Sequence, residues 1–347
     1  MAPRKHSWKT PLLLFAYLVA IGGLASAAWI YHNSRNGQSA QSSPKPTPAV
    51  RAVTAIAVAA PTKAPAPPDL ILPAEQVPAR PHFQVSVDPM EDFRADLKSA
   101  LIRQLDPAFP EFSKYIAMDG DKGDDPELRN FTFQLFDATA KAAANDQPAM
   151  LLAADLLASK IWCGDENKEG CEPLRREFTQ RNLTFAHEEL GGGFYYSRDL
   201  LWRVWRDYPA NDAGERAFVL LLELGWDTSG VCAKGADQFQ EVIRQGESFL
   251  KDRPSSPNRP VVTLLVGQAY ATWWALSNQT SADMSDYVDP RRYQTGANEA
   301  RLKAIHYFES LLQIAPNTKL GEFASQTLPP LRVEQVPEEN KFFCIYD

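Results

Sequence analysis

From residue 89 onward, apolar side chains recur at the three- and four-residue spacing of amphipathic helices. Residues 88–91 (DPME) combine an aspartate cap, a proline at the first helical position and a glutamate three residues after the cap, which together mark a helix start. Apolar residues then occupy every fourth position, at Phe93, Leu97, Leu101 and Leu105. Convincing strand-like alternation is absent from the sequence after residue 90. The pattern therefore predicts an all-α domain over residues 89–347.

Further helices are expected along the whole domain. Capping residues or prolines begin helices at Asp125, Pro148 and Asp212. The stretch Leu174–Leu190 predicts another helix, which stops at the glycines of positions 191–193 because glycine disfavours helix. The remaining segments lie at residues 238–252, 260–278, 297–315 and 319–328. Residues 261–277 contain four polar side chains, which favours a buried core helix over a second membrane span.

Three of these helix ends share one spacing, in which a small or apolar residue, two apolar residues and a proline fall at offsets 0, 4, 7 and 12. The sets are Ser197/Leu201/Val204/Pro209, Val242/Gly246/Phe249/Pro254 and Ala304/Phe308/Leu311/Pro316. Leu224-Gly225 and Val266-Gly267 with Tyr270 add an apolar–glycine–aromatic element.

This pattern resembles the tetratricopeptide repeat over roughly residues 197–328. The resemblance implies stacked helical hairpins that form a superhelix and bind a protein or an extended peptide. The chain departs from the family in its period, because its prolines are not about 34 residues apart. Ser197 and Gly246 also differ from the family consensus, and the last interval needs an insertion near residues 280–295. Stacked helical hairpins need no exact period.

The N-terminal segment is the longest apolar run. Residues 11–31 carry no charged side chain, and at about 1.5 Å per residue they match the hydrocarbon core of a membrane. Arg4, Lys5 and Lys9 precede the run, which predicts a cytoplasmic N-terminus. We expect a single-pass protein of the inner (cytoplasmic) membrane, with residues 32–347 in the periplasm. The alternative is a signal peptide that is cleaved after residues 25–27 (ASA), so that the protein is secreted.

Residues 32–88 are rich in proline and alanine, and they predict a disordered, extended linker. The net charge of −7 comes from the domain, because residues 1–88 hold more basic than acidic side chains. An acidic domain repels phosphate backbones, so nucleic acid is not expected as a partner.

The four cysteines predict two disulfides in an exported protein. Cys163 and Cys171 are eight positions apart across a polar loop, and their pairing leaves Cys232 with Cys344. A zinc site is disfavoured, because no CxxC motif occurs and the domain holds only His187 and His306. We expect neither a metal nor a cofactor.

Residues 187–196 (HEELGGGFYY) form the most site-like stretch. Glu188 or Glu189 could act as a general acid in glycan cleavage, with Tyr195 and Tyr196 shaping the site, but a second carboxylate at a defined separation cannot be assigned. The structural alternative is a helix that ends at a glycine stop. A calcium-loop interpretation of residues 119–125 fails, because Asp124 and Asn130 occupy the sixth and twelfth positions.

The sequence thus favours a tethered helical-repeat scaffold without catalysis, which binds a protein or peptide partner at the cell envelope. An envelope enzyme acting on glycan is the alternative. The inserted segment 280–296 is the expected contact region, and the candidate residues are Tyr287, Arg291, Arg292 and Tyr293, together with Tyr195 and Tyr196.

Overall fold

The computed structural model describes residues 80–118, 125–164, 168–188, 192–228, 237–278, 289–338 and 341–342. All of them belong to one compact unit, Ala74–Asp347. The expected membrane segment 11–31, the expected linker up to residue 79 and the rejected calcium-like stretch 119–124 lie outside the described residues.

Within the described residues, no helix combines the length and the apolar character that crossing a membrane requires.

The described unit is mostly helical, as the apolar spacing predicted. Its first helices are α2 (Glu91–Leu105), α3 (Phe112–Ile116), α4 (Pro126–Thr139), α5 (Gln147–Ala158) and α6 (Lys168–Gln180). They are followed by α7 (Asp199–Asp207), α8 (Asp212–Glu223), α9 (Gln238–Asp252), α10 (Arg259–Asn278), the 3-10 turn η3 (Pro290–Tyr293), α11 (Ala297–Ile314) and α12 (Lys319–Arg332).

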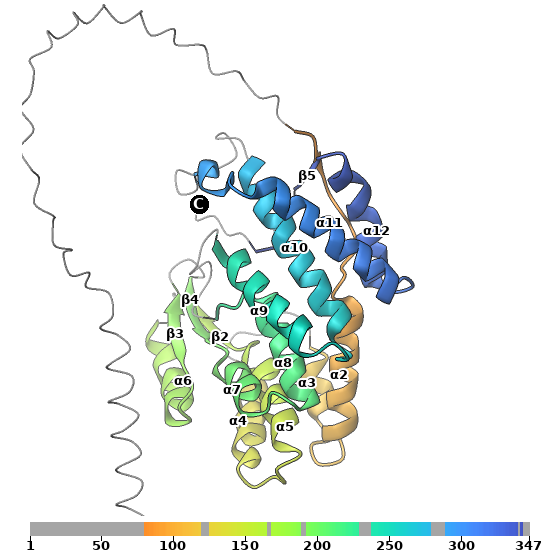
Figure 1. Cartoon of the computed structure of the whole chain (residues 1–347). Helices are drawn as coiled ribbons and strands as arrows, with labels where there is room; N and C mark the ends of the chain where they lie inside the picture. The colour runs from red at the N-terminus through yellow and green to blue at the C-terminus, as the bar shows by residue number, and fades with distance from the viewer. Residues whose placement is uncertain are drawn as a thin grey trace, which may run out of the picture. The chain divides into compact units, whose positions relative to one another are not determined.

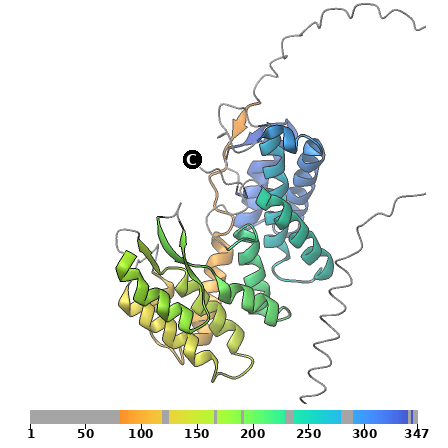
Figure 2. The ribbon, with the colours of Figure 1, turned by 90° about the vertical axis from the view of Figure 1, so that its left-hand side faces the viewer.

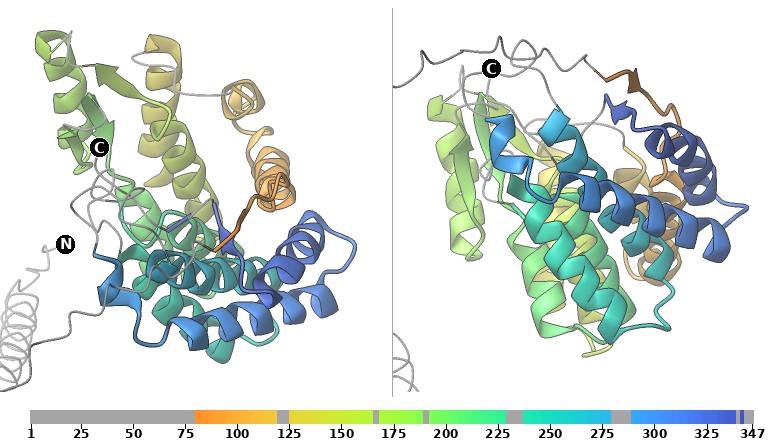
Figure 3. Two further views of the ribbon diagram at one scale, coloured as in Figure 1. Left: turned by 90° about the horizontal axis from the view of Figure 1, so that it is seen from above. Right: turned by 45° about the horizontal axis from the view of Figure 1, so that its top comes forward.

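From α7 onward, helices that follow one another in the chain pack together. Helix α10 lies between α9 and α11, α12 packs on α11, and α7 packs on α8 (Figures 1 and 3). In the other part of the unit, α5 contacts α2, α4, α7 and α8. This arrangement is compatible with a helical-repeat fold.

The three helix ends that share a sequence spacing also share a backbone geometry. Helices α7, α9 and α11 end at Tyr208, Arg253 and Ala315, with φ of −132°, −132° and −143° and ψ of 46°, 62° and 50°. Each of these residues is followed by one of the three prolines. The repeated spacing therefore marks a repeated way of ending a helix.

The turns that follow α7 and α11 are alike as well. Gly214 and Gly321 each lie five residues after the proline. A Cβ atom on Gly214 would overlap the carbonyl oxygen of Tyr208, and a Cβ atom on Gly321 would overlap that of Ala315. Each glycine thus lets the next helix begin directly against the end of the previous one.

Two other glycines set the distance between helices. A Cβ atom on Gly246 of α9 would overlap the side chain of Val266 on α10, and one on Gly267 of α10 would lie 3.0 Å from the ring of Phe308 on α11. The close approach of α9 to α10 explains why glycine stands at position 246, where the repeat consensus has another residue.

The all-α prediction was wrong for residues 162–196, which contain a three-stranded antiparallel sheet with the order β2-β4-β3. Its strands are β2 (Trp162–Gly164), β3 (Phe185–Glu188) and β4 (Gly193–Tyr196), with Trp162 opposite Tyr195 and Phe185 opposite Tyr196. Figure 2 shows this sheet beside α6, apart from α11 and α12.

The expected helix 174–190 ends at Gln180 because tertiary contacts favour a strand after it. The ring of Phe178 on α6 stacks on Phe185 at 4.7 Å and on Tyr196 at 5.5 Å between centroids. Asn182, with a φ of 56°, turns the chain back so that β3 can cover α6. These contacts join residues far apart in the sequence, which single-sequence periodicity does not capture.

A second pair of strands joins the beginning and the end of the described unit. Strand β1 (His82–Phe83) runs parallel to β5 (Val336–Pro337), with His82 opposite Val336 (Figure 1). Residues 80–88, which the sequence analysis placed in the linker, therefore contact the helical domain.

A buried carboxylate connects α5, β4 and α7. Asp155 is fully buried, and its Oδ1 accepts hydrogen bonds from the Tyr196 hydroxyl and the Leu201 amide, both at 3.1 Å. Its Oδ2 lies 2.7 Å from Nη2 of Arg198. Burial, and then the charge of Asp155, raise the pKa of Tyr196 well above its ordinary value, so the phenol remains a neutral donor.

Replacement of Asp155 by asparagine is expected to destabilise the unit by about 3–5 kcal/mol, because it leaves the mostly buried Arg198 without a charge partner. Asp137→Asn is the matched control, because the Asp137 side chain, which pairs with Arg181 at 2.8 Å, is 53% exposed, so this ion pair should contribute at most about 1 kcal/mol. Chemical denaturation of both variants measures the difference, and equal losses would contradict this account.

Gly214→Ala and Gly321→Ala should each lower the free energy of unfolding by about 1–3 kcal/mol or more, because the added methyl group meets backbone rather than a movable side chain. Gly170→Ala, at an exposed position of α6, should be neutral or stabilising, because alanine favours helix. Thermal unfolding of the three variants tests the comparison. Unchanged midpoints for positions 214 and 321 would show that these turns can relax.

Candidate functional site

A cavity of about 770 Å³ lies between an extended chain segment and the helices α10, α11 and α12. Residues 83–89 form one wall. The opposite side is formed by Gln268, Ala271 and Thr272 of α10, Phe308 of α11, and Phe323 and Thr327 of α12. Pro337 and Lys341 line it as well. Its volume falls within the range of roughly 300–1,000 Å³ that is typical of ligand sites.

The extended wall has a strand-like alternation of exposure. Phe83, Val85 and Val87 are half-buried, whereas Gln84 and Ser86 between them are exposed. In an extended chain, alternate side chains point to opposite faces, so one face of this segment turns its apolar side chains inward. The alternation lies in residues that the abundance of proline led us to assign to the linker.

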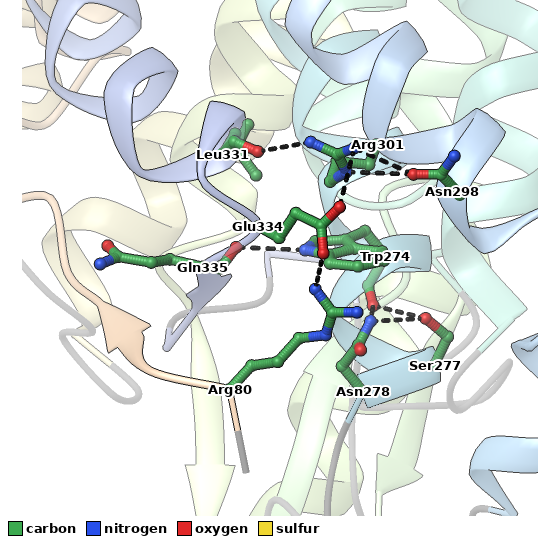
Figure 4. Close-up of polar contacts among 9 residues, drawn as sticks. All are labelled: Arg80, Trp274, Ser277, Asn278, Asn298, Arg301, Leu331, Glu334 and Gln335. Atoms are coloured by element: carbon green, nitrogen blue, oxygen red, sulfur yellow. Dashed lines mark hydrogen bonds and ion pairs between the residues drawn. The ribbon is translucent and has the colours of Figure 1, made fainter. Parts of the chain in front are cut away.

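Polar contacts at one end hold this segment in place, and we call Arg80, Trp274, Arg301 and Glu334 the anchor cluster. Figure 4 shows Glu334 between the two arginines, both of which lie near the Trp274 ring. Glu334 forms ion pairs with Arg80 and, at 3.4 Å, with Arg301. The guanidinium carbons of Arg80 and Arg301 lie 4.8 and 5.5 Å from the centroid of the Trp274 ring.

Backbone contacts complete the anchor. Arg301, only 8% exposed, donates from Nη1 to the carbonyl oxygen of Leu331 at 2.9 Å. The indole of Trp274 donates to the carbonyl oxygen of Gln335 at 3.1 Å (Figure 4). The anchor cluster thus fixes the end of α12 and strand β5, against which β1 pairs.

One buried polar atom in the cavity lining has no hydrogen-bond partner among the described residues. The Oε1 atom of Gln268 is buried and accepts no hydrogen bond. An unsatisfied buried acceptor costs roughly 1–3 kcal/mol, so its presence in a cavity lining is consistent with a donor supplied from outside. In the sequence, Gln268 is only one polar residue within a core helix, and nothing nearby indicates that it lines a cavity.

The stretch 187–196 lies in the sheet and not at a helix end. Glu188 is half-buried at the end of β3, and Glu189 lies outside the described residues. Tyr196 is buried and bonded to Asp155, so it cannot meet a partner at the surface. Tyr195 is half-buried and stacks on Trp162, with 6.1 Å between the ring centroids. Glu188, Tyr195 and Tyr196 are not among the described residues that line the cavity.

The disulfide pairing of Cys163 with Cys171 is present, and their Cα atoms are 5.7 Å apart. It connects β2 to α6 and so attaches the sheet to the helix that it covers. Cys232 and Cys344 lie outside the described residues.

The inserted segment 280–296 is described only from Asp289 onward, so Tyr287 lies outside the described residues. Tyr293 is 4% exposed, its hydroxyl donates to Asp237 at 3.0 Å, and its carbonyl oxygen accepts from Trp273 at 3.0 Å. This burial contradicts its expected role as a partner contact. Burial, together with the hydrogen bond to Asp237, raises the pKa of Tyr293 to about 12.

Arg291 and Arg292 lie at the surface. The Arg291 side chain is 88% exposed and pairs with Asp289 at 2.9 Å, and Arg292 pairs with Asp237 at 3.3 Å. Both arginines thus keep the exposure that contact with a partner requires.

Within the described residues, no group of three or more histidine, cysteine, aspartate or glutamate side chains could hold a metal ion.

Comparisons of the chain with protein-family models, curated proteins and solved structures find no match.

Acid should loosen the anchor cluster. The hydrogen bond from Arg80 lowers the pKa of Glu334 below its ordinary value, so the ion pair stabilises β1–β5 above the ordinary carboxyl range and is lost as pH falls through the lowered pKa. Hydrogen exchange of the Val336 and Glu338 amides, which donate to Pro81 and Phe83, reports this pairing. Protection, corrected for intrinsic rates, should fall between pH 7 and pH 3.

Glu334→Gln is the control for this measurement. Its protection should already be reduced at pH 7 and should change less on acidification, since the titrating carboxylate is gone. An equal acid-induced loss in the wild type and in Glu334→Gln would assign the effect to other groups.

Proposed function

We propose that this chain is a protein- or peptide-binding helical scaffold that residues 11–31 hold at the inner membrane, with the domain on the periplasmic side. Residues 32–79 then act as a linker between the membrane and the domain. The charge-free run and the basic residues before it support this placement.

The repeated helix ends support the scaffold. Three helices end with the same backbone geometry before a proline, and each packs against the helix that follows it. We infer that α7–α12 form a degenerate array of the tetratricopeptide type. Arrays of stacked hairpins commonly bind partners along one face.

The observation that carries the proposal is the cavity of about 770 Å³ on α10, α11 and α12. Helices and an extended segment surround it with mostly apolar and uncharged polar side chains, together with the charged residues Asp88 and Lys341, as expected of a binding site. Arg291 and Arg292 add an exposed cationic contact beside the array.

The glycan-cleaving alternative would need a second carboxylate that faces Glu188 across a cleft. Glu188 is not among the residues that line the cavity, so the cavity supports binding rather than this chemistry.

Site-specific photo-crosslinking in membranes of the producing cells tests the proposed function. A photoreactive phenylalanine analogue is placed at Ser86, which is exposed and lines the cavity. The full-length chain should give one or a few discrete protein adducts, because a partner in the cavity lies within reach of this side chain.

The control carries the same analogue at Ala95, an exposed position of α2 outside the cavity. This variant should give no such adduct. Identical adduct patterns from positions 86 and 95, or no adduct from either, would reject the cavity as the binding site of a scaffold.

A further inference from the structure

The extended wall of the cavity has unused main-chain hydrogen-bonding groups. Strand β5 pairs with β1 through the Val336 amide, which donates to Pro81 at 3.1 Å, and the Glu338 amide, which donates to Phe83 at 2.9 Å. The backbone of Val85, Ser86 and Val87, which follows, makes no hydrogen bond to any part of the chain that the structure describes. Among the described residues, the last strand contact on this edge is therefore the one between Glu338 and Phe83, where the segment begins to line the cavity.

The open positions continue the edge that β5 occupies. In an extended chain the main-chain groups of alternate residues point to the same side. Pro81 and Phe83 accept hydrogen bonds from β5, so Val85 and Val87 present their N–H and C=O groups on that side. Pro337 and Lys341 line the cavity at the end of β5, so the free edge borders the cavity.

The other side of the cavity supplies one complementary acceptor. Gln268 lines the cavity, and its buried Oε1 has no partner. The main chain of a bound peptide would satisfy both features. One of its N–H groups can donate to this oxygen, and its other N–H and C=O groups can pair with Val85 and Val87.

The other residues on the helical side of the cavity favour uncharged side chains in a bound peptide. Ala271 and Thr272 of α10, Phe308 of α11, and Phe323 and Thr327 of α12 carry no charge. The hydroxyls of Thr272 and Thr327 already donate to carbonyl oxygens of their own helices. The two charged residues that line the cavity, Asp88 and Lys341, already form ion pairs with Arg94 and Glu223. A charged side chain placed against the helices would therefore lose hydration without gaining a free partner of opposite charge.

We propose that the cavity binds an extended peptide segment of a partner protein, which continues strand β5 along Val85–Val87. The segment hydrogen-bonds to this edge and to Gln268, and it places apolar side chains at alternate positions against α10, α11 and α12. This inference rests on the proposed scaffold function and names the form in which a partner binds.

The probe is a capped, fluorescein-labelled heptapeptide, Lys-Val-Thr-Val-Thr-Val-Lys, titrated with the purified full-length chain in detergent. Two further peptides carry N-methyl groups on the valines or on the threonines, which removes the donors of one edge. The parent peptide should bind saturably in fluorescence anisotropy. At least one methylated peptide should bind at least about tenfold more weakly.

Three protein variants locate the binding. Gln268→Leu keeps the volume and removes the amide, and Ala271→Trp fills the cavity, so both should weaken the parent peptide at least about tenfold. Ala95→Trp on the exposed face of α2 should bind like the wild type. Thermal unfolding identifies folded variants, and Gln268→Leu decides the outcome if Ala271→Trp does not fold.

Three outcomes with the full-length chain would overturn the proposal. They are no saturable binding below about 1 mM peptide, equal binding of all three peptides, and no effect of Gln268→Leu. A chain that ends at Phe342 is measured in parallel. Binding that appears only in this shortened chain would assign the cavity to the chain's own C-terminal residues and also overturn the proposal.

Failure here is distinguishable from failure of the scaffold function. Protein adducts from position 86 that persist in the Gln268→Leu variant would keep the scaffold and reject strand addition. Loss of both adducts and peptide binding would reject both.

Discussion

Helix α10 is apolar on all sides, and the need to cover it governs the arrangement of the C-terminal part of the unit. Most of its residues from Val261 to Ser277 are buried. Gly246 and Gly267 let α9 and α11 approach it closely on two sides. The remaining side cannot face solvent without exposing apolar surface, which costs about 25 cal/mol per Å². The extended segment 83–89 covers that side, and the cavity lies between this segment and Gln268, Ala271 and Thr272.

The segment 83–89 can cover α10 only if it stays attached to the helical domain. The anchor cluster explains how the short strand β1 holds it there. A parallel pair of two residues per strand contributes little, because isolated strand pairs are marginal in water. The hydrogen bonds of Arg301 reinforce the pairing of β1 with β5. Arg301 is almost fully buried, and charge-assisted hydrogen bonds are stronger in a buried place than at an exposed surface. Trp274 contributes from α10 itself, so the helix that needs cover also holds the segment that covers it.

The sequence predicted the features that depend on local order. The stripe Phe93, Leu97, Leu101 and Leu105 is the buried face of α2, and the Asp125 side chain caps α4 by accepting the amides of Glu127 and Leu128. Three prolines located equivalent helix ends because a proline cannot continue the helix that precedes it.

The features that depend on distant partners were missed. Strand β3 exists because Phe185 meets Phe178 and Tyr196, and Tyr293 is buried because Asp237 and Trp273 receive it. Asp155 was an acid within an apolar helix, and only the fold brings Tyr196 and Arg198 to it. The candidate site was missed for a different reason. The alternation at Phe83, Val85 and Val87 was visible in the sequence, but nearby prolines favoured a linker.

The magnitudes of strand addition indicate what such a site requires of its partner. Three hydrogen bonds of about 1 kcal/mol each, with two valine-sized side chains at about 1.5–3 kcal/mol each, give roughly 6–9 kcal/mol. The loss of translational and rotational freedom on binding costs about 4–15 kcal/mol, which offsets much or all of this favourable binding free energy. A short free peptide would therefore bind weakly. If residues 11–31 anchor the chain and the partner shares the membrane, the effective concentration of the partner rises and this cost falls. In that case a cavity with low affinity for a peptide is sufficient, because a long proline-rich linker would let the domain reach a partner that the membrane holds nearby.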